Sequence, residues 1–155
     1  MKNSIGFGVV LAILSSSAGA FGATILSATQ HSGYTTIEDA FENHCELSPT
    51  GAVTGYQNSG WTGNAWTTIK PISFQLTTHA VRLVMRTILK AKLGSILDGP
   101  AICDAGSVDI SATPNGANSP FIVLKALDCD SSHVNQSQAA KSLLVWVANE
   151  CKIKY

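Results

Sequence analysis

The sequence predicts a small α+β domain in which an antiparallel sheet packs against one central and one C-terminal helix. Three observations lead to this fold class. Two segments, 78–97 and 135–150, carry apolar residues at helical spacing, and strand-like segments separate them. Two β-like segments in the C-terminal half are joined by a connection containing Asn-Gly, which is typical of a hairpin. Four cysteines predict two disulfides. Because helices and sheet each have one apolar face, they are expected to share a core.

Composition excludes several classes of protein. The chain has 155 residues, of which 45% are hydrophobic and 13% charged, with 10 Lys+Arg and 10 Asp+Glu. A zero net charge argues against a nucleic-acid partner, and the hydrophobic content argues against intrinsic disorder. No run of about 18 apolar residues exists, so we expect no membrane span once a signal peptide is removed. No internal repeat or linker divides the chain, which predicts a single domain.

The first twenty residues have the pattern of a secretory signal peptide. Lys2 gives a positive N-terminal region, residues 5–14 are apolar, and Ala-Gly-Ala at 18–20 is a small-residue cleavage site. An apolar run of this length is too short to cross a bilayer core of about 30 Å. The sequence therefore predicts a signal peptide over residues 1–20, a secreted domain over 21–155, and a secreted or periplasmic location.

The first half of the mature chain predicts a short helix, a loop and a strand. Acidic residues near the start of 35–45, followed by apolar residues at helical spacing, favour a short helix. Residues 49–63 are rich in Gly, Ser, Thr and Asn and are expected to be mostly loop, with a short strand at 52–56. Residues 66–78 are β-prone, and Pro71 within them predicts an edge strand or a break.

The segment 78–97 is the strongest predicted helix. Gly94 is expected to mark the start of its C-terminal end, and Gly99-Pro100 is expected to terminate it. Its expected apolar face is Ala80, Val81, Val84, Met85, Ile88 and Ala91, with Leu89 at the margin.

The C-terminal half predicts a hairpin followed by a helix. Segments 107–112 and 121–127 are the expected strands of the hairpin. Asn135 and Gln138 resemble a capping box at the start of the helix 135–150. The expected apolar face of this helix is Ala140, Leu143, Leu144, Val147 and Cys151.

The spacing of the cysteines predicts how they pair. If the hairpin turns near Gly116, Cys103 and Cys129 lie opposite each other, within the distance that a disulfide needs. The helix between Cys129 and Cys151 would hold them roughly 20 Å apart. We therefore expect Cys103–Cys129 and Cys45–Cys151, the second bond joining the first and last predicted helices. The same spacing argues against a zinc site, so no metal and no cofactor are expected.

Two surfaces are candidates for binding. The first is a stripe of basic residues on the central helix, made of His79, Arg82, Arg86 and Lys90. It would suit an acidic protein surface, lipid headgroups or an acidic polysaccharide, and the alternative is a solvated face whose arginines pair with the protein's own acids. The second is an aromatic, Gly-rich stretch that contains Tyr56, Trp61 and Trp66.

Aromatic rings among amide and hydroxyl groups are typical of both sugar sites and protein-binding hot spots. The alternative interpretation is structural: Trp66 begins a core strand and Trp61 covers the edge of the core.

The sequence gives no clear catalytic signal. It contains no G-x-S-x-G, H-E-x-x-H or phosphate-binding loop motif. The best acid–base candidates are His79, His133 and Asp109, and nothing in their spacing unites them. No catalytic residue is therefore predicted, and a non-enzymatic protein is favoured.

The leading hypothesis is an exported binding protein that recognises another protein, as an inhibitor, an immunity factor or a secreted virulence component does. The first alternative is a small secreted hydrolase acting on cell-wall or surface polymer, which would depend on His79 or His133. The second is a sugar-binding or toxin-delivery subunit with a glycan partner.

Overall fold

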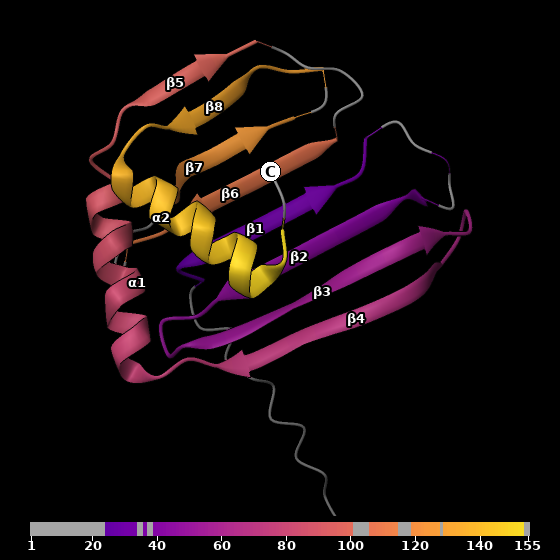
Figure 1. Ribbon diagram of the computed structural model, residues 1–155, viewed down its shortest axis with the longest axis horizontal. Helices are drawn as coiled ribbons and strands as arrows, with labels where there is room; N and C mark the ends of the chain where they lie inside the picture. Colours follow the sequence, from indigo (N-terminus) through magenta and orange to yellow (C-terminus); the bar gives the residue numbers. More distant parts are fainter. Residues whose placement is uncertain are drawn as a thin grey trace, which may run out of the picture.

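An eight-stranded antiparallel sheet with two helices over one face forms the fold (Figure 1). The computed structural model describes residues 24–33, 36, 39–100, 106–114, 119–127 and 129–153. The α+β class is therefore confirmed. The predicted signal peptide lies outside the described residues.

The strands pair in the order β4-β3-β2-β1-β6-β7-β8-β5, so that β4 and β5 are the edges. Every neighbouring pair is antiparallel. Their bounds are β1 Leu26–His31, β2 Phe41–Leu47, β3 Ala52–Trp61, β4 Trp66–Gln75, β5 Ile96–Gly99, β6 Ser107–Ala112, β7 Phe121–Ala126 and β8 Ser132–Asn135. The β6–β7 pair confirms the predicted hairpin, and β4 confirms the edge position predicted from Pro71.

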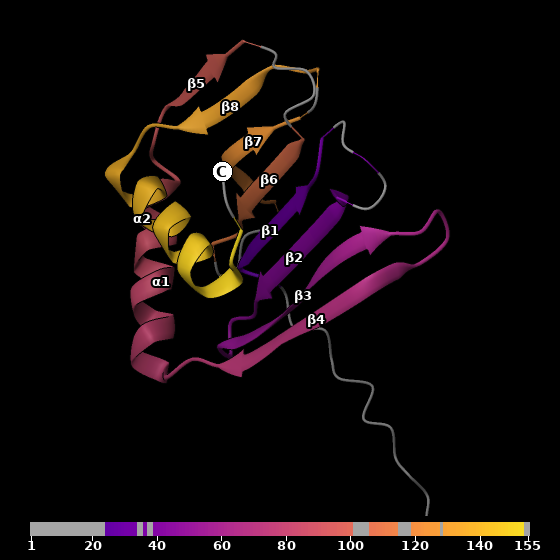
Figure 2. The ribbon, with the colours of Figure 1, turned by 45° about the vertical axis from the view of Figure 1, so that its right-hand side comes forward.

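The two helices lie side by side, α1 along the ends of the strands and α2 diagonally across the sheet (Figure 2). α1, Thr78–Ala91, joins the two edge strands β4 and β5. α2, Gln138–Trp146, follows β8 and continues into a π-helical turn, η2, Val147–Cys151. Hydroxyl caps start both helices: Thr77 Oγ1 accepts from the amide of Ala80, and Ser137 Oγ accepts from the amide of Ala140.

One core joins both helices to the sheet, as predicted. All five residues expected on the apolar face of the C-terminal helix are buried, and so are Val81, Val84, Ile88 and Ala91 of α1. All of these except Val81 belong to one core cluster with strand residues such as Leu47, Ile110 and Val123. Leu89 belongs to the other side of α1, since 54% of it is exposed.

The Cys45–Cys151 disulfide fastens the end of the C-terminal helix to the middle of the sheet. The two Cα atoms are 5.7 Å apart and 106 residues apart in sequence, which confirms this predicted pair. The other predicted bond, Cys103–Cys129, involves Cys103, which lies outside the described residues. None of the cysteines in the described segments is free.

The short helix expected over 35–45 is wrong, because Phe41–Leu47 is the strand β2. Its residues alternate with period two: Phe41, Asn43, Cys45 and Leu47 on one face, and Glu42, His44 and Glu46 on the other. Before it the chain makes a turn, in which the amide of Asp39 donates to the carbonyl of Thr36. Acidic residues near Asp39 resembled the start of a helix and concealed this alternation.

The strand expected at 52–56 is present, but the loop expected around it is mostly wrong, because β3 continues to Trp61 and covers Ala52–Trp61. β3 pairs with β2 on one side and with β4 on the other, so backbone hydrogen bonds hold it whatever its side chains are. Gly55 lies opposite Cys45, and a Cβ at this position would clash with the His44 carbonyl oxygen. The glycine that suggested a loop therefore allows two strands to approach closely.

Both helices are shorter than expected. α1 ends at Ala91 rather than 97, and the chain continues into β5. The C-terminal helix starts at Gln138, since Asn135 is the last residue of β8 and Ser137 is the true cap. Sequence periodicity does not distinguish these short edge strands from helix ends.

Candidate functional site

The predicted basic stripe is exposed on α1. His79, Arg82, Arg86 and Lys90 all lie on the surface. The ion pairs found among the described residues join His44 to Glu46 and His133 to Asp98. Within that part of the chain, the arginines of the stripe therefore have no acidic partner, and the interpretation in which they pair with the protein's own acids gains no support.

Exposed leucines interleave with these cations. Leu83, Leu89 and Leu93 are 59%, 54% and 88% exposed. We call the surface formed by Arg82, Leu83, Arg86, Leu89, Lys90 and Leu93 the basic–leucine face. Leu89 also lines a hollow of about 60 Å³ together with Met85, Ile88, Ile25 and Thr113. Pockets for small molecules have roughly 300–1,000 Å³, so this hollow suits a single inserted side chain better than a cofactor.

The aromatic stretch does not form one platform. Trp61 and Trp66 face each other at the end of the β3–β4 hairpin, with ring centroids 5.1 Å apart and planes tilted by 58°. Trp66 begins β4, as the structural interpretation expects, but neither tryptophan belongs to the core cluster. Tyr56 lies farther along β3, where its ring contacts His44.

Tyr56 is held in its neutral form by Glu42. Its hydroxyl donates to Glu42 Oε1 at 2.6 Å. This hydrogen bond, partial burial and the charge of Glu42 raise the pKa of Tyr56 to about 12. At neutral pH the phenol is therefore protonated and donates its hydrogen bond to Glu42.

The sheet face opposite the helices carries a row of residues that crosses all eight strands and is polar on every strand except β4. We call it the open face, because no described helix covers it. In the strand register, each member of the row lies directly opposite the next member on the neighbouring strand. From β5 to β4 the members are Asp98, His133, Lys125, Asp109, Thr29, His44, Tyr56 and Pro71. Core residues such as Cys45 and Ile110 alternate with members of this row along their strands, which places the row on the other face.

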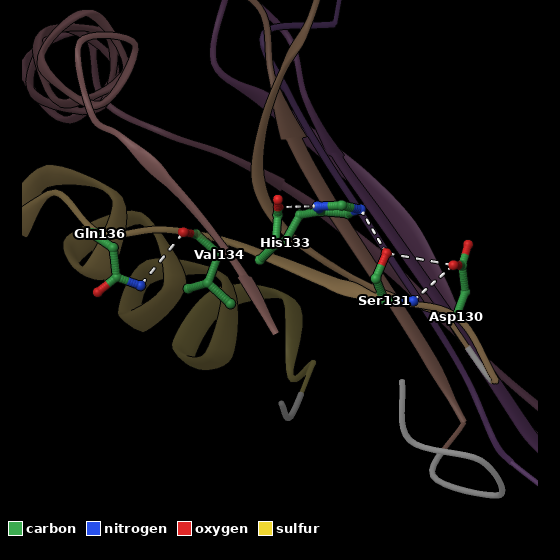
Figure 3. Close-up of polar contacts among 6 residues, drawn as sticks. Asp130, Ser131, His133, Val134 and Gln136 are labelled. Carbon is green, nitrogen blue, oxygen red and sulfur yellow. Dashed lines mark hydrogen bonds and ion pairs between the residues drawn. The ribbon is translucent and has the colours of Figure 1, made fainter. Parts of the chain in front are cut away.

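A serine, a histidine and an aspartate come together at one end of this row (Figure 3). His133 Nδ1 lies 2.6 Å from Asp98 Oδ1, and His133 Nε2 lies 3.2 Å from Ser131 Oγ. The amide of Ser131 donates to Asp130 Oδ1 at 2.7 Å. We call Asp98, His133 and Ser131 the His133 cluster.

The sequence named only one member of the His133 cluster. Of its three acid–base candidates, Asp109 lies two strands from His133, with Lys125 between them, and His79 lies on α1, over the other face. Ser131 and Asp98 were missed because β8 and β5 were not predicted as strands. Once they are, the two-residue spacing of Ser131 and His133 would have placed them on one face.

A second arrangement of the same kind lies on β1 and β2. His44 Nδ1 is 3.4 Å from Thr29 Oγ1, and its Nε2 is 3.3 Å from Glu46 Oε1. These distances exceed the corresponding distances at His133. His44, Thr29 and Glu46 therefore form a looser version of the His133 cluster.

The described residues contain neither a group of metal-ligating side chains nor a helix suited to span a membrane. Three metal-ligating side chains do not gather anywhere in those segments. Neither α1 nor α2 has the length and the apolar character that a membrane-spanning helix needs.

No protein-family model matches the chain, and no curated protein matches it either.

Proposed function

We propose that the protein is an exported binding protein that docks through the basic–leucine face onto an acidic surface of another protein. One observation carries the proposal: cations without an acidic partner in the described residues alternate with exposed leucines along one side of α1. An inhibitor, an immunity factor or a secreted virulence component would use such a face.

The face has the composition of a contact surface. Arginines form bidentate hydrogen bonds to carboxylates, and their charge attracts an acidic partner during encounter. Leucines supply apolar area that is removed from water on binding. Arg82 and Arg86 are one turn apart, so both reach the same partner surface.

α1 presents this face in a fixed orientation. Its opposite side is buried through Val81, Val84, Ile88 and Ala91, and Thr77 caps its start. A rigid helix loses little conformational entropy when it binds.

A protein partner is favoured over a lipid surface because of where the apolar residues lie. A helix that lies in a membrane interface inserts its main apolar face into the lipid. The main apolar face of α1 is already in the core. The remaining leucines are interleaved with cations, which suits a surface of mixed charge and apolar groups.

Export is part of this proposal. The Cys45–Cys151 disulfide persists in an oxidising compartment, and the sequence of residues 1–20 has the signal-peptide pattern.

The test is affinity capture from the exported protein fraction of the native source, with tagged wild type and the variant Arg82→Glu/Arg86→Glu. The matched control is Lys70→Glu/Lys152→Glu, which makes the same change of net charge at exposed positions outside α1. We expect an acidic protein that wild type and control capture equally, that the α1 variant loses, and that salt releases.

Other outcomes contradict the proposal. If the α1 variant captures every partner that wild type captures, the docking face is elsewhere. If anionic lipid vesicles, but no protein, bind in an Arg82- and Arg86-dependent way, the partner is a membrane surface. Loss of binding only in Trp61→Ala would move the contact to the β3–β4 hairpin.

A further inference from the structure

We propose that Ser131 is a nucleophile, activated by His133 and Asp98, that accepts acyl groups from esters at the open face. This activity is separate from docking through α1, which lies over the other face of the sheet.

The His133 cluster has the three groups that such a reaction needs: a nucleophile, a base next to it, and a carboxylate that orients the base. Asp98 accepts a hydrogen bond from Nδ1–H of His133, which orients the ring and leaves Nε2 as the base. Nε2 lies 3.2 Å from Ser131 Oγ, within reach of the proton that it must remove. The carboxylate and the hydroxyl thus use different ring nitrogens.

Backbone pairing fixes this geometry. The antiparallel register of β5 and β8 places Asp98 directly opposite His133. Ser131 precedes β8 by one residue and lies two residues from His133, so both side chains project to the same face. Neither distance depends on a long flexible side chain.

Two neighbouring charges define the surroundings of the cluster. Lys125 lies directly opposite His133 on β7, where its ammonium would stabilise the oxyanion that forms during acyl transfer. Asp130 holds the amide of Ser131, and its carboxylate oxygen is 3.4 Å from Ser131 Oγ, a longer contact than the one to His133.

Exposure of the cluster indicates the class of substrate. The side chain of Asp98 is 74% exposed and that of His133 is 32% exposed. An open site of this kind reaches ester groups displayed on a polymer or another surface, and it does not need to enclose the substrate. Solvent also weakens the electrostatic terms, so we expect slow turnover.

The reaction balances with an ester and water alone. Ser131 Oγ forms a bond to the ester carbonyl carbon while its proton moves to His133 Nε2. The bond to the leaving alcohol breaks, and the alcohol takes that proton. Water, deprotonated by His133, then attacks the carbonyl carbon of the acyl–Ser131 ester. The bond to Ser131 Oγ breaks, Oγ takes the proton back from His133, and a carboxylic acid is released.

The test uses p-nitrophenyl acetate with the whole mature protein. Release of nitrophenol is measured against free imidazole at the same concentration, and peptide mass spectrometry locates any acetyl group. We expect acetylation at Ser131 and a rate that falls at least about 10-fold in Ser131→Ala, His133→Ala and Asp98→Asn.

His44→Ala is the matched control, because it removes the similar but longer arrangement on β1 and β2. It should keep the wild-type rate, and thermal unfolding should show that each variant is folded. A wild-type rate no higher than imidazole, an unchanged rate in Ser131→Ala, or acetylation at other residues only would overturn the proposal.

Discussion

Asn135 joins three elements of the fold through a single side chain. It is 1% exposed, its Nδ2 donates to the carbonyl of Ala91 at the end of α1, and its Oδ1 accepts from the amide of Ser137 at the start of α2. A Cβ at Gly94 would overlap this amide group, which explains the glycine there. Asn135 therefore fixes where α1 ends and α2 begins.

Replacing Asn135 by alanine should lower the free energy of unfolding by about 2 kcal/mol, because it removes two hydrogen bonds of a buried side chain, one to the Ala91 carbonyl and one from the Ser137 amide. Urea unfolding measures this loss. Gln136→Ala, at the exposed neighbour, should change stability by less than about 0.5 kcal/mol. Equal effects of the two substitutions would show that Asn135 does not join the helices as described.

The Tyr56–Glu42 pair predicts a late-titrating tyrosine. The folded-state pKa of Tyr56, about 12, lies above its ordinary value of 10.0. The hydrogen bond therefore stabilises the fold below pH 10, and this contribution is lost as the pH rises towards 12. Tyrosinate absorbance, compared with that of Tyr56→Phe, should reveal this group. In Glu42→Gln its pKa should fall towards the ordinary value, and no fall would contradict the assigned cause.

At the scale of elements, the sequence predicted those that bury a continuous apolar face. α1 and α2 have such faces, and the β6–β7 hairpin has both alternation and a turn signal. β3 was predicted only in its first half, over 52–56, because its stability comes from pairing on two sides, which its polar composition does not show. β5 and β8, with four residues each, were too short to display a period.

The candidate site followed the same division. The basic stripe on α1 could be predicted, because helical spacing alone determines which residues share a side. The His133 cluster could not be predicted, because it depends on the pairing of two short strands. The paired residues Asp98 and His133 are 35 residues apart in the sequence.

The tryptophan pair should stabilise only the end of the β3–β4 hairpin. Trp61 and Trp66 contact each other outside the core, so Trp61→Ala should cost about 0.5–1.5 kcal/mol locally. Hydrogen exchange of the amides near Gly60 should become faster, while the amide of the buried residue Val53 keeps its protection. Faster exchange at both places would show that the pair supports the whole sheet.

At the scale of the whole molecule, one disulfide connects the last residues to the sheet centre. Cys45–Cys151 closes a span of 106 residues, so the Cys45→Ala/Cys151→Ala variant should lose about 3–4 kcal/mol of stability. Denaturant unfolding of this variant and the oxidised parent measures the difference. A loss below about 1 kcal/mol would contradict this role, and Cys103–Cys129 stays a prediction for peptide mapping of the unreduced protein.

The sheet also separates the two proposed activities. The basic–leucine face lies on the helical side, and the His133 cluster lies on the open face. Substitutions at Arg82 and Arg86 should therefore leave the reactivity of Ser131 unchanged.

Hydroxyl-radical footprinting of the protein with its captured partner tests most directly whether α1 is the docking surface. Leu83, Leu89 and Leu93 are exposed in the free protein and should be oxidised there. We expect the partner to protect these three leucines and to leave Trp61 and Ile69 unchanged. Protection of Trp61 with full oxidation of the three leucines would contradict the account.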